Sequence, residues 1–190
     1  DNVIKDIAGL FNEIFVINNN CTDAPAGNAN NAVGPGWHDT RRGYRYACLK
    51  GLEYIEEQKA KPEIVVFLDG DYSDYPAQLT ELISPIITKN IDFVLGARVK
   101  EQRELGAMTP QQIFGNWLAT ALMKLFFGAT YTDLGPFRAI KYEKLMALKM
   151  EDKTYGWTVE MQLKALKQQL TYLEIPVRYR NRIGVSKVSG

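Results

Sequence analysis

Continuous apolar runs and helical stripes alternate along the first half of the chain. The runs predict three buried strands, at residues 13–17, 64–68 and 91–95. Apolar positions at helical spacing predict three helices, at residues 3–11, 44–55 and 76–87. This alternation indicates an α/β domain with a mostly parallel sheet, right-handed crossovers and flanking helices. The second run is apolar throughout, which is typical of a central strand covered on both faces.

The second half of the chain is less regular. Its pattern predicts a long helix at residues 110–127, a short strand at residues 137–140 and a helix around Leu163. Residues 173–180 alternate between apolar and polar side chains, which predicts a strand with one basic face. The long helix is the most apolar segment, and we expect one side of it to be buried in the core rather than to lie on a membrane surface.

Composition narrows the class of protein. The chain has 190 residues, 46% of them hydrophobic, which suits a single domain over residues 1–190. Lys and Arg number 23 against 22 for Asp and Glu, so the basic excess of a nucleic-acid binder is missing. Two cysteines and one histidine cannot form a zinc cluster, and so few cysteines fit a reducing cytoplasm. No apolar run reaches the ~20 residues that span a bilayer.

Three aspartates directly follow the second predicted strand. Asp69 and Asp71 lie two residues apart, and we expect Gly70 to let the backbone turn so that both carboxylates aim at one point. Ligands of open α/β sheets bind at the carboxyl ends of strands. Carboxylates gathered there repel each other unless a divalent cation joins them, which predicts a Mg²⁺ or Mn²⁺ site that also binds phosphates. Asp74 has a second interpretation, as an acid that begins the next helix.

Six segments, in this order, resemble the family 2 glycosyltransferases of the type that includes dolichyl-phosphate mannose synthase and its bacterial polyprenyl-phosphate relatives. They are residues 16–23, 41–51, 68–71, 96–98, 132–139 and 182–187, with the sequences VINNNCTD, RRGYRYACLKG, LDGD, GAR, TDLGPFRA and RIGVSK. The resemblance covers essentially the whole chain. It implies a GT-A fold, a UDP- or GDP-linked sugar donor, a divalent metal and inversion at the anomeric carbon.

The resemblance also implies roles for individual residues. Asp69 and Asp71 would hold the metal and the donor, with Asp71 among the catalytic residues. Asn19 and Asp23 would lie near the base and ribose of the donor. Arg98 and Arg138 would contact a phosphate, with Arg138 among the catalytic residues. Arg182, Ser186 and Lys187 would belong to a loop that closes over the diphosphate. Arginine and lysine suit this work because they meet phosphate oxygens with charge and several donors.

Glu160 is the candidate general base. Residues 155–160 resemble a Gly-aromatic stretch of the family that ends in Glu, and transfer to a hydroxyl needs a base within hydrogen-bond reach. An acid in the first turn of a helix is also favoured by the helix dipole alone. A lipid phosphate is already ionised at neutral pH, and such an acceptor needs no base.

The resemblance favours a polyprenyl or dolichyl phosphate as acceptor, and hence peripheral contact with the inner face of the membrane. A soluble acceptor is the second choice. Outside the class, a nucleotidyltransferase or an inactive nucleotide-sugar-binding module remain alternatives. The family begins with a strand that we expect this chain to lack, because its first residues correspond to the helix after that strand.

Overall fold

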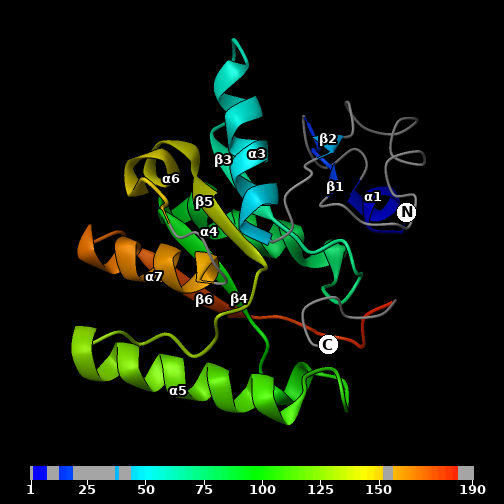
Figure 1. The fold of residues 1–190 in the computed structure, drawn as a ribbon, viewed down its shortest axis with the longest axis vertical. Helices are drawn as coiled ribbons and strands as arrows, with labels where there is room; N and C mark the ends of the chain where they lie inside the picture. Colours follow the sequence, from blue (N-terminus) through cyan, green and yellow to red (C-terminus); the bar gives the residue numbers. More distant parts are fainter. Residues whose placement is uncertain (1, 8–12, 19–36, 39–43, 152–155, 184–190) are drawn as a thin grey trace. The chain divides into compact units, whose positions relative to one another are not determined.

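The computed structural model describes residues 2–7, 13–18, 37–38, 44–151 and 156–183 (Figure 1). The chain divides into two compact units, residues 1–62 with 150–160 and residues 63–149 with 161–190. Helix α7 (Trp157–Lys167) begins in the first unit and continues in the second.

The first unit contains short elements and one long helix. They are α1 (Asn2–Ile7), β1 (Ile17–Asn18), β2 (Trp37–His38) and α3 (Tyr44–Glu57). β1 and β2 pair in parallel. Helix α3 buries Leu52 and Ile55, and the ring of Tyr54 packs edge-on against Phe15 with 4.8 Å between centroids. The predicted helix at residues 44–55 is confirmed, whereas the predicted strand at residues 13–17 is reduced to its end.

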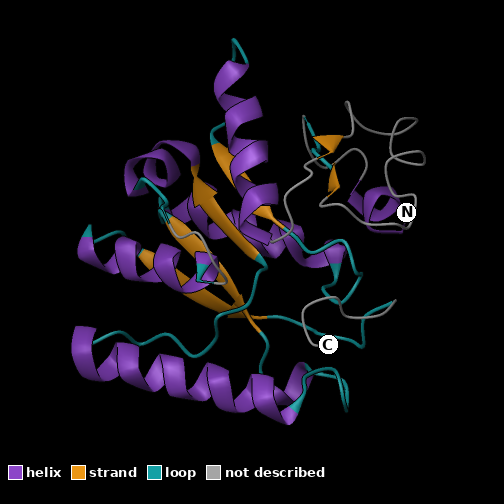
Figure 2. Cartoon of the chain, in the orientation of Figure 1, coloured by secondary structure: helices purple, strands orange, loops and turns teal. Residues whose placement is uncertain are grey.

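The second unit is built on a four-stranded mixed sheet (Figure 2). Its strands are β3 (Ile64–Phe67), β4 (Phe93–Ala97), β5 (Arg138–Lys141) and β6 (Tyr172–Pro176), in the order β3-β5-β4-β6. β4 and β6 pair in parallel, and β5 runs antiparallel to β3 and to β4. Three of the four strands point the same way, but two of the three strand pairs are antiparallel. The predicted α/β fold is confirmed, with a mixed sheet.

β5 enters the sheet between β3 and β4, a position that the sequence pattern did not predict. Among the strands that the structure describes, β3 is therefore terminal in its sheet, and the prediction of a central strand is wrong there. Only Val65 of β3 is buried, while its three neighbours are partly exposed. An apolar run indicates that a strand is covered, but it does not specify which strand pairs with it.

Helices connect the strands of this sheet. They are η1 (Pro76–Gln78), α4 (Leu79–Lys89), η2 (Lys100–Gln102), α5 (Pro110–Phe127) and α6 (Tyr142–Leu148), followed by the second part of α7. Of these, α4 and α6 contact the sheet. Helix α4 packs on β4 and β5 and buries Leu79, Leu82 and Ile86. The helix predicted at residues 76–87 is confirmed, with Pro85 inside it.

Helix α5 has the predicted bounds but not the predicted burial. Thr109 and Gln112 form a capping box at its start, and Gly128 ends it with a left-handed φ of 65°. Met123 is its one buried residue. Eight large apolar side chains of α5 are exposed: Ile113, Phe114, Trp117, Leu118, Leu122, Leu125, Phe126 and Phe127. The expectation that one apolar side would be buried in the core is therefore wrong for most of the helix. None of the helices that the structure describes has the length and apolar content needed to cross a membrane.

Gly96 lies inside β4, not at its end as the sequence pattern predicted. A Cβ atom at this position would lie 3.0 Å from the methyl carbons of Val177 and 3.1 Å from the ring of Phe137. Both are closer than packed carbon atoms allow, so the glycine lets two segments pack directly on β4.

We expect Gly96→Ala to destabilise the protein by about 1–3 kcal/mol, because the added methyl group must displace packed side chains. Gly115→Ala is the matched control, since no atom lies within 4 Å of a Cβ at that position in α5. The control should stabilise the protein by about 0.5–1 kcal/mol through helix propensity. Urea unfolding measures both changes. If Gly96→Ala were as stable as the wild type, the packing on β4 would not require glycine.

Candidate functional site

The loop after β3 fixes the side chain of Asp71 at the carboxyl end of the strand. Oδ1 of Asp71 accepts hydrogen bonds from the backbone N–H of Ser73 at 3.0 Å and from its Oγ at 2.6 Å. This pattern is an Asx turn, in which a short acidic side chain closes the backbone on itself. The second oxygen, Oδ2, remains directed toward other groups of the site.

The backbone of this loop turns at Gly70 and Asp71, as expected. The next residue, Tyr72, has a φ of 61°, in the left-handed region that non-glycine residues rarely adopt. Gly70 itself has no positive φ, and a Cβ there would meet nothing within 4 Å, so the turn does not depend on the special freedom of glycine. Backbone strain at Tyr72 lies directly beside Asp71, which is typical of functional sites.

Asp69 carries negative charge that the protein does not fully neutralise. Its pKa is raised to about 6, first by burial and then by the charge of Asp71. The charges of Arg98, Arg182 and Arg138 act in the opposite direction but do not outweigh burial. The two aspartates and three arginines therefore form one electrostatic cluster at the end of β3.

The aspartate pair is suited to a divalent cation. Within the residues that the structure describes, no three acidic, cysteine or histidine side chains converge as metal ligands. Mg²⁺ is commonly bound by one or two carboxylates, with substrate phosphates and water completing its shell. A cation shared by Asp69 and Asp71 would offset the repulsion that raises the pKa of Asp69. The residues present thus fit Mg²⁺ or Mn²⁺.

Asp74 is a third acid in the same electrostatic field. It is 1% exposed, and within the described part of the chain neither of its carboxylate oxygens has a hydrogen-bond partner. Burial, and then the charge of Asp69, raises its pKa to about 8. Tyr75, not Asp74, precedes η1, and Asp74 instead forms a backbone bridge with Tyr179. Its interpretation as the acid that begins a helix is therefore wrong.

The segment after β6 returns to these aspartates. Nη1 of Arg182 lies 3.6 Å from Oδ2 of Asp71, and the backbone N–H of Ile183 donates to the Asp71 carbonyl at 2.9 Å. The Arg182 and Asp71 side chains are 32% and 24% exposed. This pair is therefore open to solvent and can be rearranged by a ligand that binds either partner.

Three residues that the sequence pattern did not single out hold this segment in place. The guanidinium of Arg180 lies 3.4 Å from the ring centroid of Tyr72 and 4.3 Å from that of Tyr75. Its Nε donates to the Tyr72 carbonyl at 2.6 Å. Arginine stacks well on aromatic faces, so the contact fixes the strained turn and the C-terminal segment together. Arg180 was visible in the sequence only as part of a basic face.

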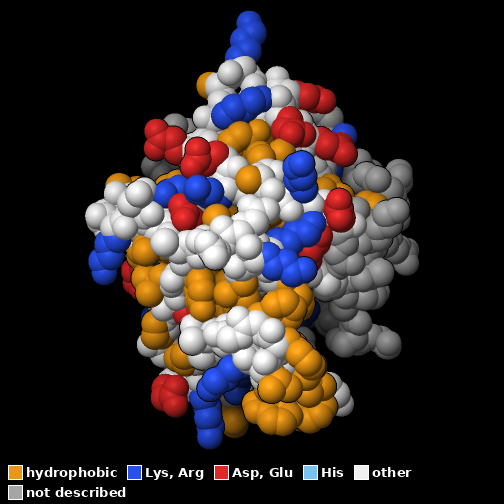
Figure 3. Space-filling model, turned by 90° about the vertical axis from the view of Figure 1, so that its left-hand side faces the viewer, with side chains coloured by type: hydrophobic (Ala, Val, Ile, Leu, Met, Phe, Trp, Pro, Cys, Tyr) orange, Lys and Arg blue, Asp and Glu red, His pale blue; other side chains and the backbone are white. Residues whose placement is uncertain are grey.

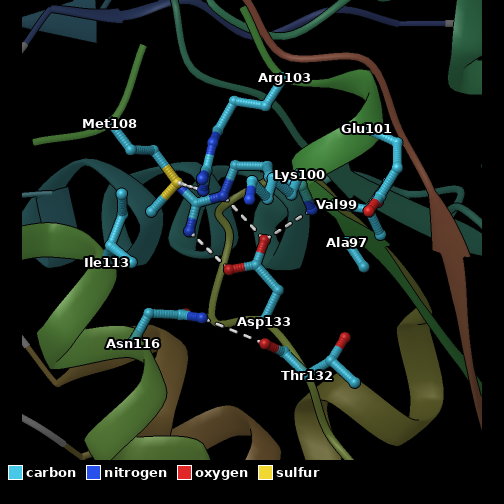
Figure 4. Close-up of a pocket in the computed structure, with 11 residues that line it drawn as sticks. Ala97, Val99, Lys100, Glu101, Arg103, Met108, Ile113, Asn116, Thr132 and Asp133 are labelled. Atoms are coloured by element: carbon cyan, nitrogen blue, oxygen red, sulfur yellow. Dashed lines mark hydrogen bonds and ion pairs between the residues drawn. The ribbon is translucent and has the colours of Figure 1, made fainter. Parts of the chain in front are cut away.

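Arg98 forms a buried pair with Asp133, whose side chain is labelled among the cavity-lining residues in Figure 4. Its Nε and Nη2 donate to the two carboxylate oxygens at 2.8 Å each, and its backbone N–H donates at 2.9 Å. Burial alone would raise the pKa of Asp133, but the hydrogen bonds and charge of Arg98 outweigh it and lower that pKa. Arg98 thus links the end of β4 to the loop before β5, and its contact with phosphate stays a prediction.

The Arg98–Asp133 pair lines a cavity of about 300 Å³ that also touches η2 and α5. Arg103 and Met108 lie across it in Figure 4, with Nη1 of Arg103 donating to the Met108 sulfur at 3.1 Å. Asn116 of α5 donates to the Thr132 carbonyl at 3.1 Å from the other side.

Arg138 begins β5 and is fully buried. Its Nε donates to the Gly135 carbonyl at 3.2 Å, and its guanidinium lies 5.8 Å from the ring centroid of Phe93. Through the bond to Gly135, Arg138 holds the loop before β5 in place. Its role at a phosphate stays a prediction.

Glu160 belongs to the first unit. Its Oε1 accepts a hydrogen bond from the backbone N–H of Glu151 at 2.6 Å, and its place in the first turn of α7 suits an acid. Its role as a base stays a prediction. The predicted donor contacts Asn19, Asp23, Ser186 and Lys187 lie outside the described residues.

Comparison with known proteins gives consistent matches. A sequence model described as glycosyl transferase family 2 matches residues 1–149. The undecaprenyl-phosphate mannosyltransferase of Micrococcus luteus is 26% identical over 156 residues, which cover 80% of this chain and 63% of that protein. The UDP-N-acetylglucosamine–dolichyl-phosphate N-acetylglucosaminyltransferase of Methanococcus voltae is 29% identical over 144 residues, 74% of this chain and 57% of that protein.

The fold resembles solved glycosyltransferase structures. Glucosyl-3-phosphoglycerate synthase from Mycobacterium tuberculosis, in complex with Mn²⁺, UDP and phosphoglyceric acid, superposes with a TM-score of 0.70 at 18% identity. The match covers 98% of this chain and 64% of the synthase. The expected GT-A fold is thereby confirmed. The chain spans less than two thirds of the length of each of these three proteins.

We expect Asp74→Asn to be more stable than the wild type at pH 7, by on the order of a few kcal/mol. The folded pKa of about 8 lies above the ordinary value of 3.8, so the unfolded chain releases a proton that the folded chain keeps. Wild-type stability should therefore fall as pH rises from about 4 toward 8, and the advantage of the variant should vanish near pH 4.

Urea unfolding at several pH values, without divalent cations, measures this difference. Glu143→Gln is the control, because the Glu143 side chain is 76% exposed and its removal should change stability little at any pH. A variant less stable than the wild type at pH 7 would show that Asp74 is ionised and stabilising in the fold.

Proposed function

The chain belongs to glycosyl transferase family 2, and from this premise we propose that it is a metal-dependent, inverting glycosyltransferase. Its donor is a UDP- or GDP-linked sugar, and its acceptor is a polyprenyl or dolichyl phosphate. One observation carries the proposal: Asp69 and Asp71 lie together after the end of β3, and burial and then the charge of Asp71 raise the pKa of Asp69 to about 6. A divalent cation and the diphosphate of a donor complete such a site.

On the donor side, Asp69 and Asp71 would hold Mg²⁺ or Mn²⁺, which neutralises charge on a leaving nucleoside diphosphate. Arg182, now 3.6 Å from Asp71, would exchange this carboxylate for the diphosphate when the donor binds. A guanidinium can do so because it meets phosphate oxygens with two parallel donors. The stacked Arg180 keeps the backbone of Arg182 close during the exchange.

Transfer then needs little covalent chemistry from the protein. An acceptor oxygen attacks the anomeric carbon from the face opposite the diphosphate; the new carbon–oxygen bond forms as the bond to the diphosphate breaks. The nucleoside diphosphate leaves with the bonding electrons, and the configuration inverts. The work of the chain is to position the two phosphate-bearing groups and to balance their charge, with Arg98 and Arg138 as further cations of the cluster.

The names of the two sequence relatives support a lipid phosphate acceptor, undecaprenyl phosphate in one and dolichyl phosphate in the other. A soluble phosphorylated acid is the second candidate, because the structural neighbour was crystallised with phosphoglyceric acid. With a lipid acceptor, the protein works at the inner face of the membrane.

Residues 1–190 would act as one nucleotide-sugar-binding domain. Within it, Asn19 and Asp23 would contact the base and ribose, and Ser186 and Lys187 would close over the diphosphate. Glu160 would serve as a base only for a hydroxyl acceptor, because an ionised phosphate oxygen needs no proton removed.

We expect the full-length protein to transfer labelled sugar to polyprenyl phosphate in the presence of Mn²⁺ or Mg²⁺. Asp71→Asn should lower kcat by about 10²-fold or more, because it removes a metal ligand while conserving shape. Glu143→Gln, which alters an exposed acid of α6, should act like the wild type. If chelation of divalent cations left transfer unchanged, the metal-dependent proposal would be wrong.

Glu160→Gln distinguishes the two acceptor classes. With a lipid phosphate we expect its kcat to stay within a few-fold of the wild type, since no proton is removed. With a hydroxyl acceptor a lost general base should cost about 10²–10⁴-fold. Rates with polyprenyl phosphate and with phosphoglycerate, measured side by side, check this. Transfer to phosphoglycerate alone would overturn the lipid acceptor.

A further inference from the structure

The segment at residues 179–183 lies between two other loops of the second unit. Its first residue, Tyr179, forms an antiparallel bridge with Asp74, which closely follows the aspartate pair. Tyr179 also forms a parallel bridge with Arg103, which follows η2. Backbone groups on both sides of the segment are therefore bonded within the protein. The same segment carries Arg182.

Glu104 bonds the residue directly before Arg182. Its Oε2 accepts the backbone N–H of Asn181 at 2.9 Å and the side-chain Nδ2 of Asn181 at 3.2 Å. The Leu105 carbonyl accepts the same Nδ2 at 3.3 Å. A carboxylate that accepts a backbone N–H forms a charge-assisted hydrogen bond, which is stronger than a neutral one. Asn181 is therefore fixed through its backbone and its side chain at once.

A tight turn presents these acceptors to Asn181. The backbone N–H of Ala107 donates to the Glu104 carbonyl at 3.1 Å, and Gly106 has a φ of 82°. A positive φ at the third residue is typical of a type II turn, which favours glycine at that position. The N–H of Glu104 itself donates to the Tyr179 carbonyl at 2.8 Å, so the turn and the segment are joined along their backbones.

The backbone of Arg182 is held on both sides. Before it, Asn181 is bonded to Glu104, and after it the N–H of Ile183 donates to the Asp71 carbonyl at 2.9 Å. The Arg182 side chain is 32% exposed and lies 3.6 Å from Asp71. This distance is longer than the roughly 2.7–2.9 Å of a charge-assisted hydrogen bond. The guanidinium can therefore change partners while its backbone stays in place.

Glu104 differs from an ordinary surface acid. On the face shown in Figure 3, acidic side chains are interspersed with Lys and Arg. Exposed ion pairs between such residues contribute little to stability. The Glu104 carboxylate is also exposed, yet it bonds the backbone of another loop. This contact indicates a function in holding that loop.

We propose that Glu104 is a positioning residue for the sugar donor, which holds Asn181 so that the guanidinium of Arg182 reaches the diphosphate. The inference rests on the proposed function, because it takes the diphosphate as the partner to which Arg182 turns. Glu104 acts through Arg182 and takes no direct part in binding. Without Glu104 the segment must be ordered when the donor binds, and this ordering lowers the affinity.

Calorimetric titration of UDP and GDP in the presence of Mn²⁺ tests the proposal on the full-length protein. The proteins are the wild type, Glu104→Ala, Arg182→Ala and the double variant Glu104→Ala, Arg182→Ala. They form a double-mutant cycle, which measures whether the two residues act through each other. Glu143→Ala, which removes a 76% exposed acid of α6, is the matched control.

We expect Glu104→Ala to weaken binding of the nucleotide about fivefold when Arg182 is present, because a charge-assisted hydrogen bond is lost. Binding should not change further when Arg182 is already alanine. A merely structural effect on the loop would weaken binding by the same factor in both backgrounds. Glu104→Gln should bind within about twofold of the wild type, because its amide oxygen still accepts the Asn181 N–H. The control should bind like the wild type.

Hydrogen exchange gives a second measurement that needs no nucleotide. In Glu104→Ala, the backbone amides of Asn181 and Ile183 should exchange about tenfold faster than in the wild type, because the segment opens more often. The amides of β3 should exchange at an unchanged rate.

The outcomes separate this inference from the proposed function. If the wild type binds a nucleotide, equal losses in both backgrounds or unchanged exchange in Glu104→Ala would overturn the inference alone. A wild type that binds neither UDP nor GDP would overturn the proposed function, and the inference with it.

Discussion

The buried pair between Arg98 and Asp133 fixes the loop at residues 132–135, which leads into strand β5 of the second unit. Three hydrogen bonds of 2.8–2.9 Å join the end of β4 to this loop, which leads directly into β5. Gly135 permits the close approach, since a Cβ there would lie 3.0 Å from the Asp133 carboxylate and 3.1 Å from Nε of Arg98. Glu174 of β6 and Asn116 of α5 bond the same loop from other sides. Losing one partner of such a buried pair costs about 3–5 kcal/mol, so the placement of β5 rests on it.

Near this loop the protein places two acidic side chains where burial disfavours their charged forms. Asp69 and Asp74 both have raised pKa values, about 6 and about 8, with burial as the first cause in each. Acidic groups with raised pKa values lower the stability of a fold, and they are found most often where a ligand or cation binds. The segment after β6 supplies Arg182, and the stacking of Arg180 on Tyr72 holds that segment against the strained turn. Arg180 and Tyr72 thus position both the aspartates and Arg182, the cation that would bind a diphosphate.

Sequence alone predicted what is local. The apolar pattern predicted the bounds of α5, and the Asp-x-Asp segment after an apolar run predicted the charged cluster. The sequence pattern did not predict features that depend on contacts between residues far apart in the chain. β5 enters the sheet between β3 and β4 because the 132–135 loop is anchored elsewhere, and Arg180 meets a tyrosine 108 residues away. The exposure of α5 was missed because apolar periodicity predicts an apolar side without specifying whether protein covers it.

Calorimetric titration of UDP and GDP, with and without Mn²⁺, tests whether Asp69 and Asp71 form a metal-dependent diphosphate site. We expect the wild type to bind one nucleotide far more tightly with Mn²⁺ than without, and Asp69→Asn to lose this metal-dependent gain while remaining folded. Binding that is equally tight without Mn²⁺, or unchanged in Asp69→Asn, would contradict a metal-dependent site.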